Sequence, residues 1–273
     1  MNNFIINWNP SLGIDLGFYV IRYYSLCFLI SFLLGLEVMK RIYKYENISL
    51  DKLDKLFMYV VISTVLGARL GHVFFYDWKY FSTHLLEILL PFKFSPFAFT
   101  GFSGLASHGA AIGIILALYF YSKNILQKPL IYILDRLSLS IAIAGGFIRI
   151  GNFMNSEIIG VPTNGSFGVI FRALGENFPR HPSQLYESIC YFLLFLVLWM
   201  IFWKTDKKNQ SGFIFGVFFS ALWSIRFFIE FLKEAQKQDR EDWFLNTGQL
   251  LSIPLILLGI YFVFSSFSKA KTA

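Results

Sequence analysis

The sequence predicts an all-α integral membrane protein with about seven transmembrane helices. Composition is the first reason: 56% of the 273 residues are hydrophobic and only 15% are charged, whereas an average soluble domain has about 25% charged residues. The second is that apolar runs approach the length of about 20 residues that a helix needs to cross the hydrocarbon layer. We therefore expect residues 1–273 to form one polytopic membrane domain.

Seven stretches have the length and apolar character of a membrane span. In chain order, their approximate bounds are Phe18–Met39, Leu56–Tyr76, Leu105–Ser122, Ile131–Ile150, Tyr186–Trp203, Gly212–Leu232 and Gly248–Phe267. No internal repeat relates the two halves of the chain, and this weakens the alternative of a transporter built from inverted repeats. A transporter or lipid flippase stays open as a second functional class, because several spans carry ionisable residues.

Positively charged residues are distributed unevenly between the segments that join the spans. If the N-terminus lies outside, one side of the membrane receives most of them, namely Lys40, Arg41, Lys44, Lys52, Lys55, Lys123, Lys128, Lys204, Lys207, Lys208, Lys269 and Lys271. Since positive loops favour the cytoplasm, we expect the N-terminus to face out and the C-terminus to face in. These loops also explain the formal net charge of +7, which therefore does not indicate nucleic-acid binding.

Two segments on the outer side do not span. Asp77–Gly104 contains prolines and many phenylalanines, and we expect it to form an interfacial arm. Gly151–Ser183 is rich in Gly, Pro and Asn, and we expect it to form a small outer head. Long loops of this kind are often functional. Because Arg149 directly precedes the head, the site is expected at the outer membrane face.

Nothing in the sequence indicates a metal, a nucleotide or a disulfide framework. Cys27 and Cys190 both lie within apolar runs, which suggests neither a disulfide framework nor a metal site. The chain has no His-Glu-x-x-His pattern and no phosphate-binding loop, so we expect no cofactor. Residues 1–15 have no basic region before an apolar one, so we expect no cleavable signal peptide.

Polar residues interrupt the end of the fourth span. The run from Gly145 to Gly160 places Arg149, Asn152 and Glu157 among glycines and apolar residues. A charged side chain at the bilayer centre costs about 2.5–3.5 kcal/mol on insertion scales, so such residues usually face a cavity or a partner. Two interpretations are open here: a helix end with interfacial polar residues, or a binding site.

A second arginine, Arg226, lies at the same depth in the sixth span, one turn before Glu230. These two residues could neutralise each other as an i, i+4 pair, and structure alone would then explain them. However, Arg149 and Arg226 at one depth repel each other unless an anion lies between them. A guanidinium binds phosphate through two parallel hydrogen bonds, so we expect a phospholipid headgroup as the ligand.

Two further spans carry basic residues. Arg69 and His72 share one helical face, beside Gly67 and Gly71, which allow close helix approach. A buried packing site with a snorkelling arginine is the alternative there. His108 opens the third span just before a run of small residues that lets a ligand come near. A lone histidine is nevertheless more often structural.

The entry to the fifth span is densely polar. Ser183 could cap this helix, with Pro182 fixing the approach of the chain. Capping does not explain the other polar residues of the segment, which are Arg180, His181, Gln184, Tyr186 and Glu187. At the outer start of the first span, tyrosines follow an arginine, and the plain interpretation is an interfacial anchor.

These segments together resemble the signature of bacterial prolipoprotein diacylglyceryl transferases. The resemblance covers nearly the whole chain and rests on Arg149 to Glu157 with Gly160, His108-Gly109, Arg180 to Glu187, and Arg226 to Glu230. It implies a seven-span enzyme of the bacterial inner membrane, with a periplasmic N-terminus, a periplasmic head and a cytoplasmic C-terminus. Such an enzyme would move the diacylglyceryl group of phosphatidylglycerol to the cysteine thiol of a preprolipoprotein lipobox peptide, and glycerol-1-phosphate would leave.

The resemblance also implies roles for single residues. His108 matches the family's essential histidine and is the candidate base, and Arg149 and Arg226 match the arginines that hold the headgroup. Other substrate-binding positions are matched by Tyr24, Asn152, Glu157, Gly160 and Arg69. We expect supporting roles for Glu230, Arg180, His181, Gln184, Tyr186 and Glu187, with Glu157 and Glu230 orienting the arginines. Departures from the family pattern, which bear on headgroup packing, are Ile148, Ala110-Ala111 and Lys233, the last standing where arginine is common.

A serine protease of the rhomboid type is a rival interpretation. Gly101-Phe102-Ser103-Gly104 has the Gly-x-Ser-Gly form that these intramembrane proteases use. They also need a histidine on a later span, and here the later spans have none, although His181 lies just before one. Four residues of common type are weak support for this rival.

Overall fold

The computed structural model describes residues 4–18, 20–90, 92–94, 97–99, 104–234 and 245–271. The chain divides into two units, each described by itself below. The first comprises Met1–Met39 with Leu134–Ala273, and the second comprises Lys40–Ile133.

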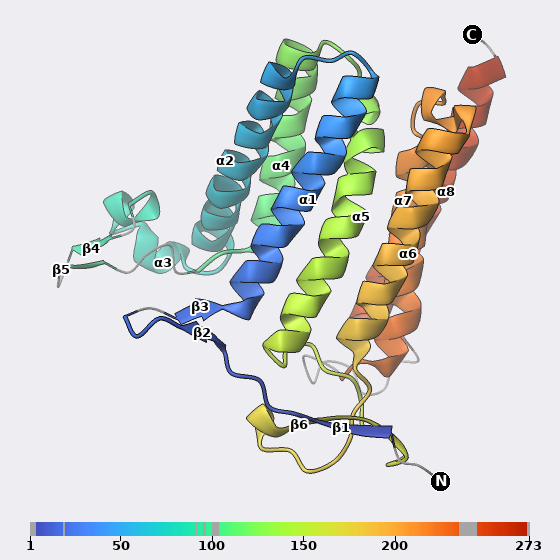
Figure 1. The fold of residues 1–273 in the computed structure, drawn as a ribbon. Helices are drawn as coiled ribbons and strands as arrows, with labels where there is room; N and C mark the ends of the chain where they lie inside the picture. The colour runs from blue at the N-terminus through green and yellow to red at the C-terminus, as the bar shows by residue number, and fades with distance from the viewer. Residues whose placement is uncertain are drawn as a thin grey trace. The chain divides into compact units, whose positions relative to one another are not determined.

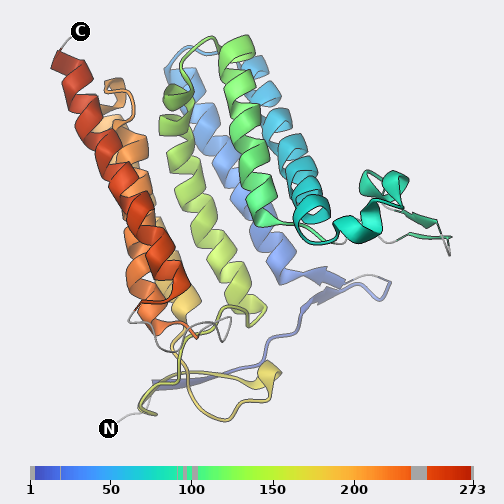
Figure 2. The ribbon, with the colours of Figure 1, turned by 180° about the vertical axis from the view of Figure 1, so that it is seen from behind.

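Long helices make up most of the first unit (Figure 1). They are α1 (Tyr23–Tyr45), α5 (Leu130–Met154), α6 (Ser183–Lys204), α7 (Phe213–Ile229) and α8 (Thr247–Lys271), of which the end of α1 and the start of α5 belong to the second unit. Short helical turns are η3 (Arg172–Leu174), η4 (Asp206–Asn209) and η5 (Glu230–Leu232). The helices α7 and α8 lie side by side in both views (Figure 2). Small residues permit this contact, since a Cβ on Gly216 would lie 2.7 Å from the backbone nitrogen of Val263.

The start of α7 is fixed by an aspartate of α5. Both carboxylate oxygens of Asp135 accept hydrogen bonds, from the backbone N–H of Gly212 and of Phe215, each at 2.8 Å. Free N–H groups at a helix start need such acceptors. Asp135 also pairs with the adjacent Arg136, at 3.8 Å. Asp135 therefore sets the position from which α7 runs to Arg226.

Short strands lie at the end of the first unit that carries the head. Strand β1 (Phe4–Trp8) pairs in parallel with β6 (Phe167–Phe171), so that Trp8 lies opposite Phe171. Strands β2 (Gly13–Asp15) and β3 (Val20–Arg22) form an antiparallel hairpin before α1. The Trp8 ring packs 4.4 Å from the Phe153 ring, in a small core with Phe171. Through this core, the N-terminal strand holds the end of α5 against the head.

The second unit is built on two helices. They are α2 (Leu50–Phe75) and α4 (Ser107–Tyr121), the latter continued by the π-helical turn η2 (Ser122–Leu126). Their backbones touch where sequence predicted close approach: a Cβ on Gly71 would lie 2.7 Å from the Cα of Gly109. Between the two helices the chain forms α3 (Trp78–Phe81), η1 (Leu85–Ile88) and the hairpin of β4 (Phe92–Phe94) and β5 (Phe97–Phe99).

Six helical segments of the described chain are long and apolar enough to cross a membrane. They are Leu50–Phe75, Ser107–Leu126, Leu130–Met154, Ser183–Lys204, Phe213–Leu232 and Thr247–Ser268. The prediction of an all-α, multi-pass membrane protein is thereby confirmed. Helix α1 has 23 residues but is not among the six, so the predicted seventh span is not confirmed, and neither is the predicted orientation of the termini.

Candidate functional site

Arg149 lies near the C-terminal end of α5, where that helix packs closely on α6. The contact is close because Gly146 has no side chain: a Cβ there would lie 2.4 Å from the Phe192 ring. One turn along α6, the hydroxyl of Ser188 donates to the Gly146 carbonyl at 2.9 Å. This packing brings Arg149 to Glu187, with Nε and Oε2 2.7 Å apart.

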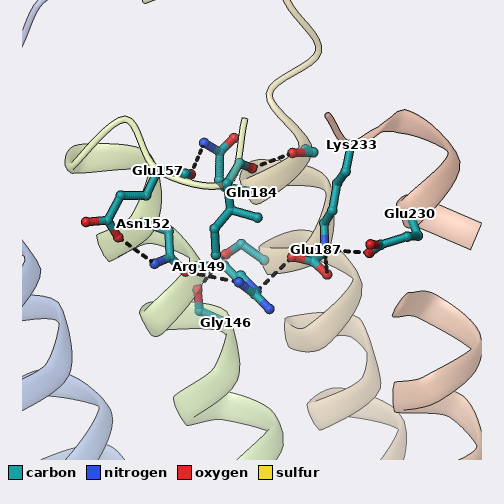
Figure 3. Close-up of polar contacts among 11 residues, drawn as sticks. Gly146, Arg149, Asn152, Glu157, Gln184, Glu187, Glu230 and Lys233 are labelled. Carbon is teal, nitrogen blue, oxygen red and sulfur yellow. Dashed lines mark hydrogen bonds and ion pairs between the residues drawn. The ribbon is translucent and has the colours of Figure 1, made fainter. Parts of the chain in front are cut away.

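Glu187 is the centre of a charged network between α5, α6 and η5 (Figure 3). Its side chain is fully buried, and its second oxygen lies 2.8 Å from the ammonium group of Lys233. The same ammonium group lies 3.4 Å from Glu230. A buried carboxylate is tolerated when cations and hydrogen bonds surround it. Here one carboxylate orients Arg149 and Lys233 together.

On its other side, Arg149 is held by an amide. Its Nη1 donates to the Asn152 side chain at 3.1 Å, and Asn152 in turn donates to Glu157 at 3.2 Å. Glu157 thus reaches the arginine only through Asn152. Glu230 contacts Lys233 (Figure 3). The direct carboxylate partner of Arg149 is Glu187, which the sequence assigned only a supporting role.

Arg226 lies three residues before the end of α7, and it faces α6 together with Arg149. Both arginines act electrostatically on the buried Tyr191 of α6. The Arg226 guanidinium carbon lies 5.5 Å from the Trp223 ring centroid, and its Nε is shielded from solvent without a hydrogen-bond partner in the described chain. The alternative of an Arg226–Glu230 pair is not realised among the described residues, because Glu230 pairs with Lys233 instead.

Tyr24 and Gly160 both occupy tight backbone contacts of the first unit. Tyr24 packs against Gly151 of α5, where a Cβ would lie 3.0 Å from the tyrosine ring. A Cβ on Gly160 would lie 2.4 Å from the carbonyl oxygen of His181 and 2.7 Å from that of Leu232. Gly160 also forms a β-bridge with Lys233. The absence of a side chain at Gly160 therefore lets the head approach the segment that carries Lys233.

The polar cluster before α6 fastens the head to this helix. Arg180 is buried, binds both oxygens of Glu176 at 2.6 Å, and donates to the Gly160 carbonyl at 3.1 Å. Gln184 is also buried and donates to the backbone carbonyl of Glu157 at 2.6 Å. His181 lies 3.3 Å from the Tyr186 hydroxyl.

The expectation that Ser183 caps α6 is wrong. Ser183 is the first helical residue, and the side chain of the preceding Pro182 makes no capping bond. The Ser183 hydroxyl instead donates to the carbonyl of Ile158 in the head, at 2.9 Å. The serine therefore contributes to head attachment, as its neighbours do.

Two of the predicted residues belong to the second unit. His108 is the second residue of α4, and its side chain is exposed. Arg69 is buried on α2 and donates to the carbonyls of Ile88 at 2.9 Å and Glu87 at 2.6 Å. Its guanidinium also stacks 4.6 Å above the Phe81 ring. These contacts attach the arm to α2.

A cavity of about 440 Å³ lies beside this attachment. Its lining combines basic, acidic and aromatic side chains, namely Arg69, His72, Asp77, Tyr80, Phe81, Glu87, Phe92 and Lys93, with Gly104. Glu87 accepts hydrogen bonds from the Phe94 backbone at 3.0 Å and the Tyr80 hydroxyl at 2.7 Å. These bonds hold the pKa of Glu87 below its ordinary value. Of the rival serine motif, Gly101, Phe102 and Ser103 lie outside the described residues.

Sequence reasoning missed two features of the site. Lys233 was noted only as a departure from a family pattern, although its spacing of three residues from Glu230 signals a helical ion pair. Trp223 drew no attention, because a tryptophan in an apolar helix is ordinary.

Comparison with known proteins identifies the family of this chain. Residues 12–265 match the family model described as prolipoprotein diacylglyceryl transferase. A protein of Chloroherpeton thalassium is 41% identical over 267 residues, which cover 97% of this chain and 96% of the relative. Relatives from Bacteroides fragilis and Tolumonas auensis are 42% identical over 270 residues (97% of each chain) and 40% identical over 254 residues (93% of this chain, 94% of the relative). All three are named phosphatidylglycerol–prolipoprotein diacylglyceryl transferase. This chain belongs to the prolipoprotein diacylglyceryl transferase family.

Proposed function

We propose that this protein transfers the diacylglyceryl group of phosphatidylglycerol to the lipobox cysteine of preprolipoproteins. The cysteine sulfur would form a thioether bond to the phosphate-bearing carbon of the glycerol that carries the two acyl chains. The carbon–oxygen bond to the phosphate would break, and glycerol-1-phosphate would leave. The proposal is supported by similarity over nearly the whole chain to relatives that bear this name.

The observation that carries the chemistry is the fixed position of Arg149. An arginine has five N–H donors, and Glu187, Asn152 and the hydroxyl of Tyr191 occupy part of this guanidinium. The remaining donors are available to a phosphate. Arg226, on the opposite helix, would bind the same phosphate, so that both arginines stabilise the charge that develops on the leaving group. Removing one such preorganised donor typically lowers a rate by about 10²–10³.

The surrounding residues would keep this clamp in place. Glu187 and Lys233 would fix the guanidinium plane of Arg149, and Asn152 and Glu157 would fix its other end. Tyr24, packed on the adjacent turn of α5, would bind the glycerol part of the headgroup. Gly160 and the polar cluster before α6 would act through the backbone, by holding the head on the helices.

A thiol with its ordinary pKa near 8.5 is mostly protonated at neutral pH, so the reaction benefits from a base. We propose His108 for this task, because histidine titrates near neutral pH and because of the family resemblance of its segment. Its exposed position at the start of α4 leaves the imidazole open to a substrate. Arg69 would serve the reaction indirectly, by holding the arm.

The cellular setting is part of the same proposal. The protein would lie in the bacterial inner membrane, with the N-terminus, the arm at 77–104 and the head at 151–183 on the periplasmic side and the C-terminus in the cytoplasm. The lysine-rich loops support this orientation.

Mass spectrometry of a lipobox peptide tests the proposal. The purified protein with phosphatidylglycerol should add one diacylglyceryl mass to the peptide cysteine, and Arg149→Ala should lower the rate of product formation by about 10²–10³. Arg172→Ala is the matched control, since Arg172 is an exposed head arginine bonded to Asn7, and it should leave the rate near wild type. An equal mass gain with phosphatidylethanolamine, or near-normal activity of Arg149→Ala, would contradict the proposal.

A further inference from the structure

Two buried hydrogen-bond donors on α7 lack acceptors. The indole Nε1 of Trp223 and the guanidinium Nε of Arg226 are both shielded from solvent, and neither finds a hydrogen-bond partner in the described chain. Buried donors in native proteins are nearly always paired with protein, water or ligand. Two orphan donors on neighbouring turns therefore call for a common explanation.

The two donors share one face of the helix. Residues three apart in an α-helix lie above one another on the same side, and the Arg226 guanidinium carbon lies 5.5 Å from the Trp223 ring centroid. The same face carries the arginine to which the proposed function assigns the phosphate. One ligand molecule can therefore contact both Arg226 and Trp223.

The Trp223 and Arg226 donors lie at different positions along α7, so they would contact different parts of a lipid. Helix α7 begins at Phe213, where Asp135 holds the preceding turn, and ends at Ile229 next to η5, which adjoins the head through the Gly160–Lys233 bridge. Trp223 precedes Arg226 by three residues and therefore lies about 4.5 Å further from the head along the helix axis. In a diacyl glycerophospholipid, the ester carbonyl oxygens lie on the acyl-chain side of the phosphate. These carbonyl oxygens accept hydrogen bonds, and an ester group has no hydrogen-bond donor.

We infer that Trp223 is a substrate-binding residue that donates its indole N–H to an ester carbonyl of the phospholipid, while Arg226 binds the phosphate one turn above. This assignment rests on the proposed function, and it adds a specificity to it: the enzyme recognises ester-linked acyl chains and discriminates against ether-linked ones. An ether lipid lacks the carbonyl and leaves the indole donor unpaired.

A comparison of transfer rates for two lipids and two protein variants tests this contact. The transfer rate at low lipid concentration is measured for diester and diether phosphatidylglycerol, with the wild-type protein and with Trp223→Phe. Phenylalanine keeps an aromatic face under Arg226 but lacks the N–H and the rest of the pyrrole ring, and the diether lipid measures the effect of the lost ring alone. One neutral hydrogen bond predicts that wild type prefers the diester lipid by about three- to tenfold. Trp223→Phe should lose this factor with the diester lipid and be unchanged with the diether lipid.

The controls separate this inference from the proposed function. Trp199→Phe on α6 should preserve the wild-type preference for the diester lipid, since Trp199 packs there against Phe195 and Trp203. Unchanged diether activity in Trp223→Phe also shows that the variant is folded. Equal use of the two lipids by wild type, or equal losses with both lipids in Trp223→Phe, would overturn the carbonyl contact alone. A wild-type protein that transferred from neither lipid would refute the proposed function, and this contact with it.

Discussion

Replacing Glu187 by glutamine should destabilise the protein more than any surface substitution. The Glu187 side chain is 0% exposed and lies 2.7 Å from Arg149, which is 16% exposed. It also lies 2.8 Å from Lys233, which is 7% exposed. Breaking a buried ion pair by removing one partner typically costs about 3–5 kcal/mol, because the other charge is left uncompensated. Here glutamine would leave Arg149 without its carboxylate partner and Lys233 with the more distant Glu230, so we expect a loss in this range.

A double variant sharpens the prediction. Lys233→Met in the Glu187→Gln background removes the cation that has lost its nearer carboxylate, so the double variant should cost less than the sum of the single variants. Coupling energies between contacting charged residues are about 0.5–3 kcal/mol. Unfolding in detergent, followed by tryptophan fluorescence, measures all three variants against the wild type.

The exposed pair of Asp51 and Lys55 is the matched control. Its side chains are 72% and 51% exposed, and exposed i, i+4 pairs contribute only about 0.3–0.5 kcal/mol. Asp51→Asn should therefore hardly change the unfolding transition. If Glu187→Gln costs no more than Asp51→Asn, or if its effect simply adds to that of Lys233→Met, the network does not hold Arg149 as described.

Two further predictions concern the head and the arm. Gly160→Ala places a Cβ about 2.4 Å from a backbone carbonyl, so it should push the head away and lower transfer while membrane insertion is kept; normal kinetics of the purified variant would contradict this. Hydrogen bonds lower the pKa of Glu87, so the ionised Glu87 carboxylate stabilises the arm. This stabilisation should be complete above the ordinary glutamate pKa of about 4.3, and it should be lost as the pH falls through the lowered pKa of Glu87. Hydrogen exchange at the Phe94 amide should accelerate at that acid pH in wild type, whereas in Glu87→Gln it should show no such step; a step of equal size in both proteins would assign it to another group.

The class of fold followed from sequence because the hydropathy of a span is local. Apolar runs near the required length predicted all six helical segments that are long and apolar enough to span. The first predicted span shows the limit of this reasoning: its helix begins only at Tyr23 and continues to Tyr45, into a segment that carries charged residues. Val20–Arg22, which were expected within that span, form strand β3 and pair with β2 instead.

The individual contacts of the site are non-local, and sequence could not supply them. Arg149, Glu187 and Lys233 lie on three different elements, and their contact depends on how α5, α6 and η5 pack. Local spacing instead suggested Arg226 with Glu230, and packing overrode it. The parallel pairing of β1 with β6 is equally non-local, because it joins the start of the chain to the head.

Lys233 illustrates how the structure explains a departure from the family pattern. An arginine at this position would offer a planar fork suited to one carboxylate, whereas the lysine ammonium is a compact point charge with three donors. Here it lies between two carboxylates, Glu187 at 2.8 Å and Glu230 at 3.4 Å. The substitution thus keeps the charge that Glu187 needs.

The central claim is that Arg149 and Arg226 bind one phosphate, and a kinetic cycle tests it most directly. The transfer rate from phosphatidylglycerol to a lipobox peptide is measured for Arg149→Ala, Arg226→Ala and the double variant. Residues that act as a unit are strongly non-additive, so each single variant should lose about 10²–10³ in rate and the double variant should lose little more. Independent losses that multiply in the double variant, or an Arg226→Ala enzyme near wild-type activity, would contradict the claim.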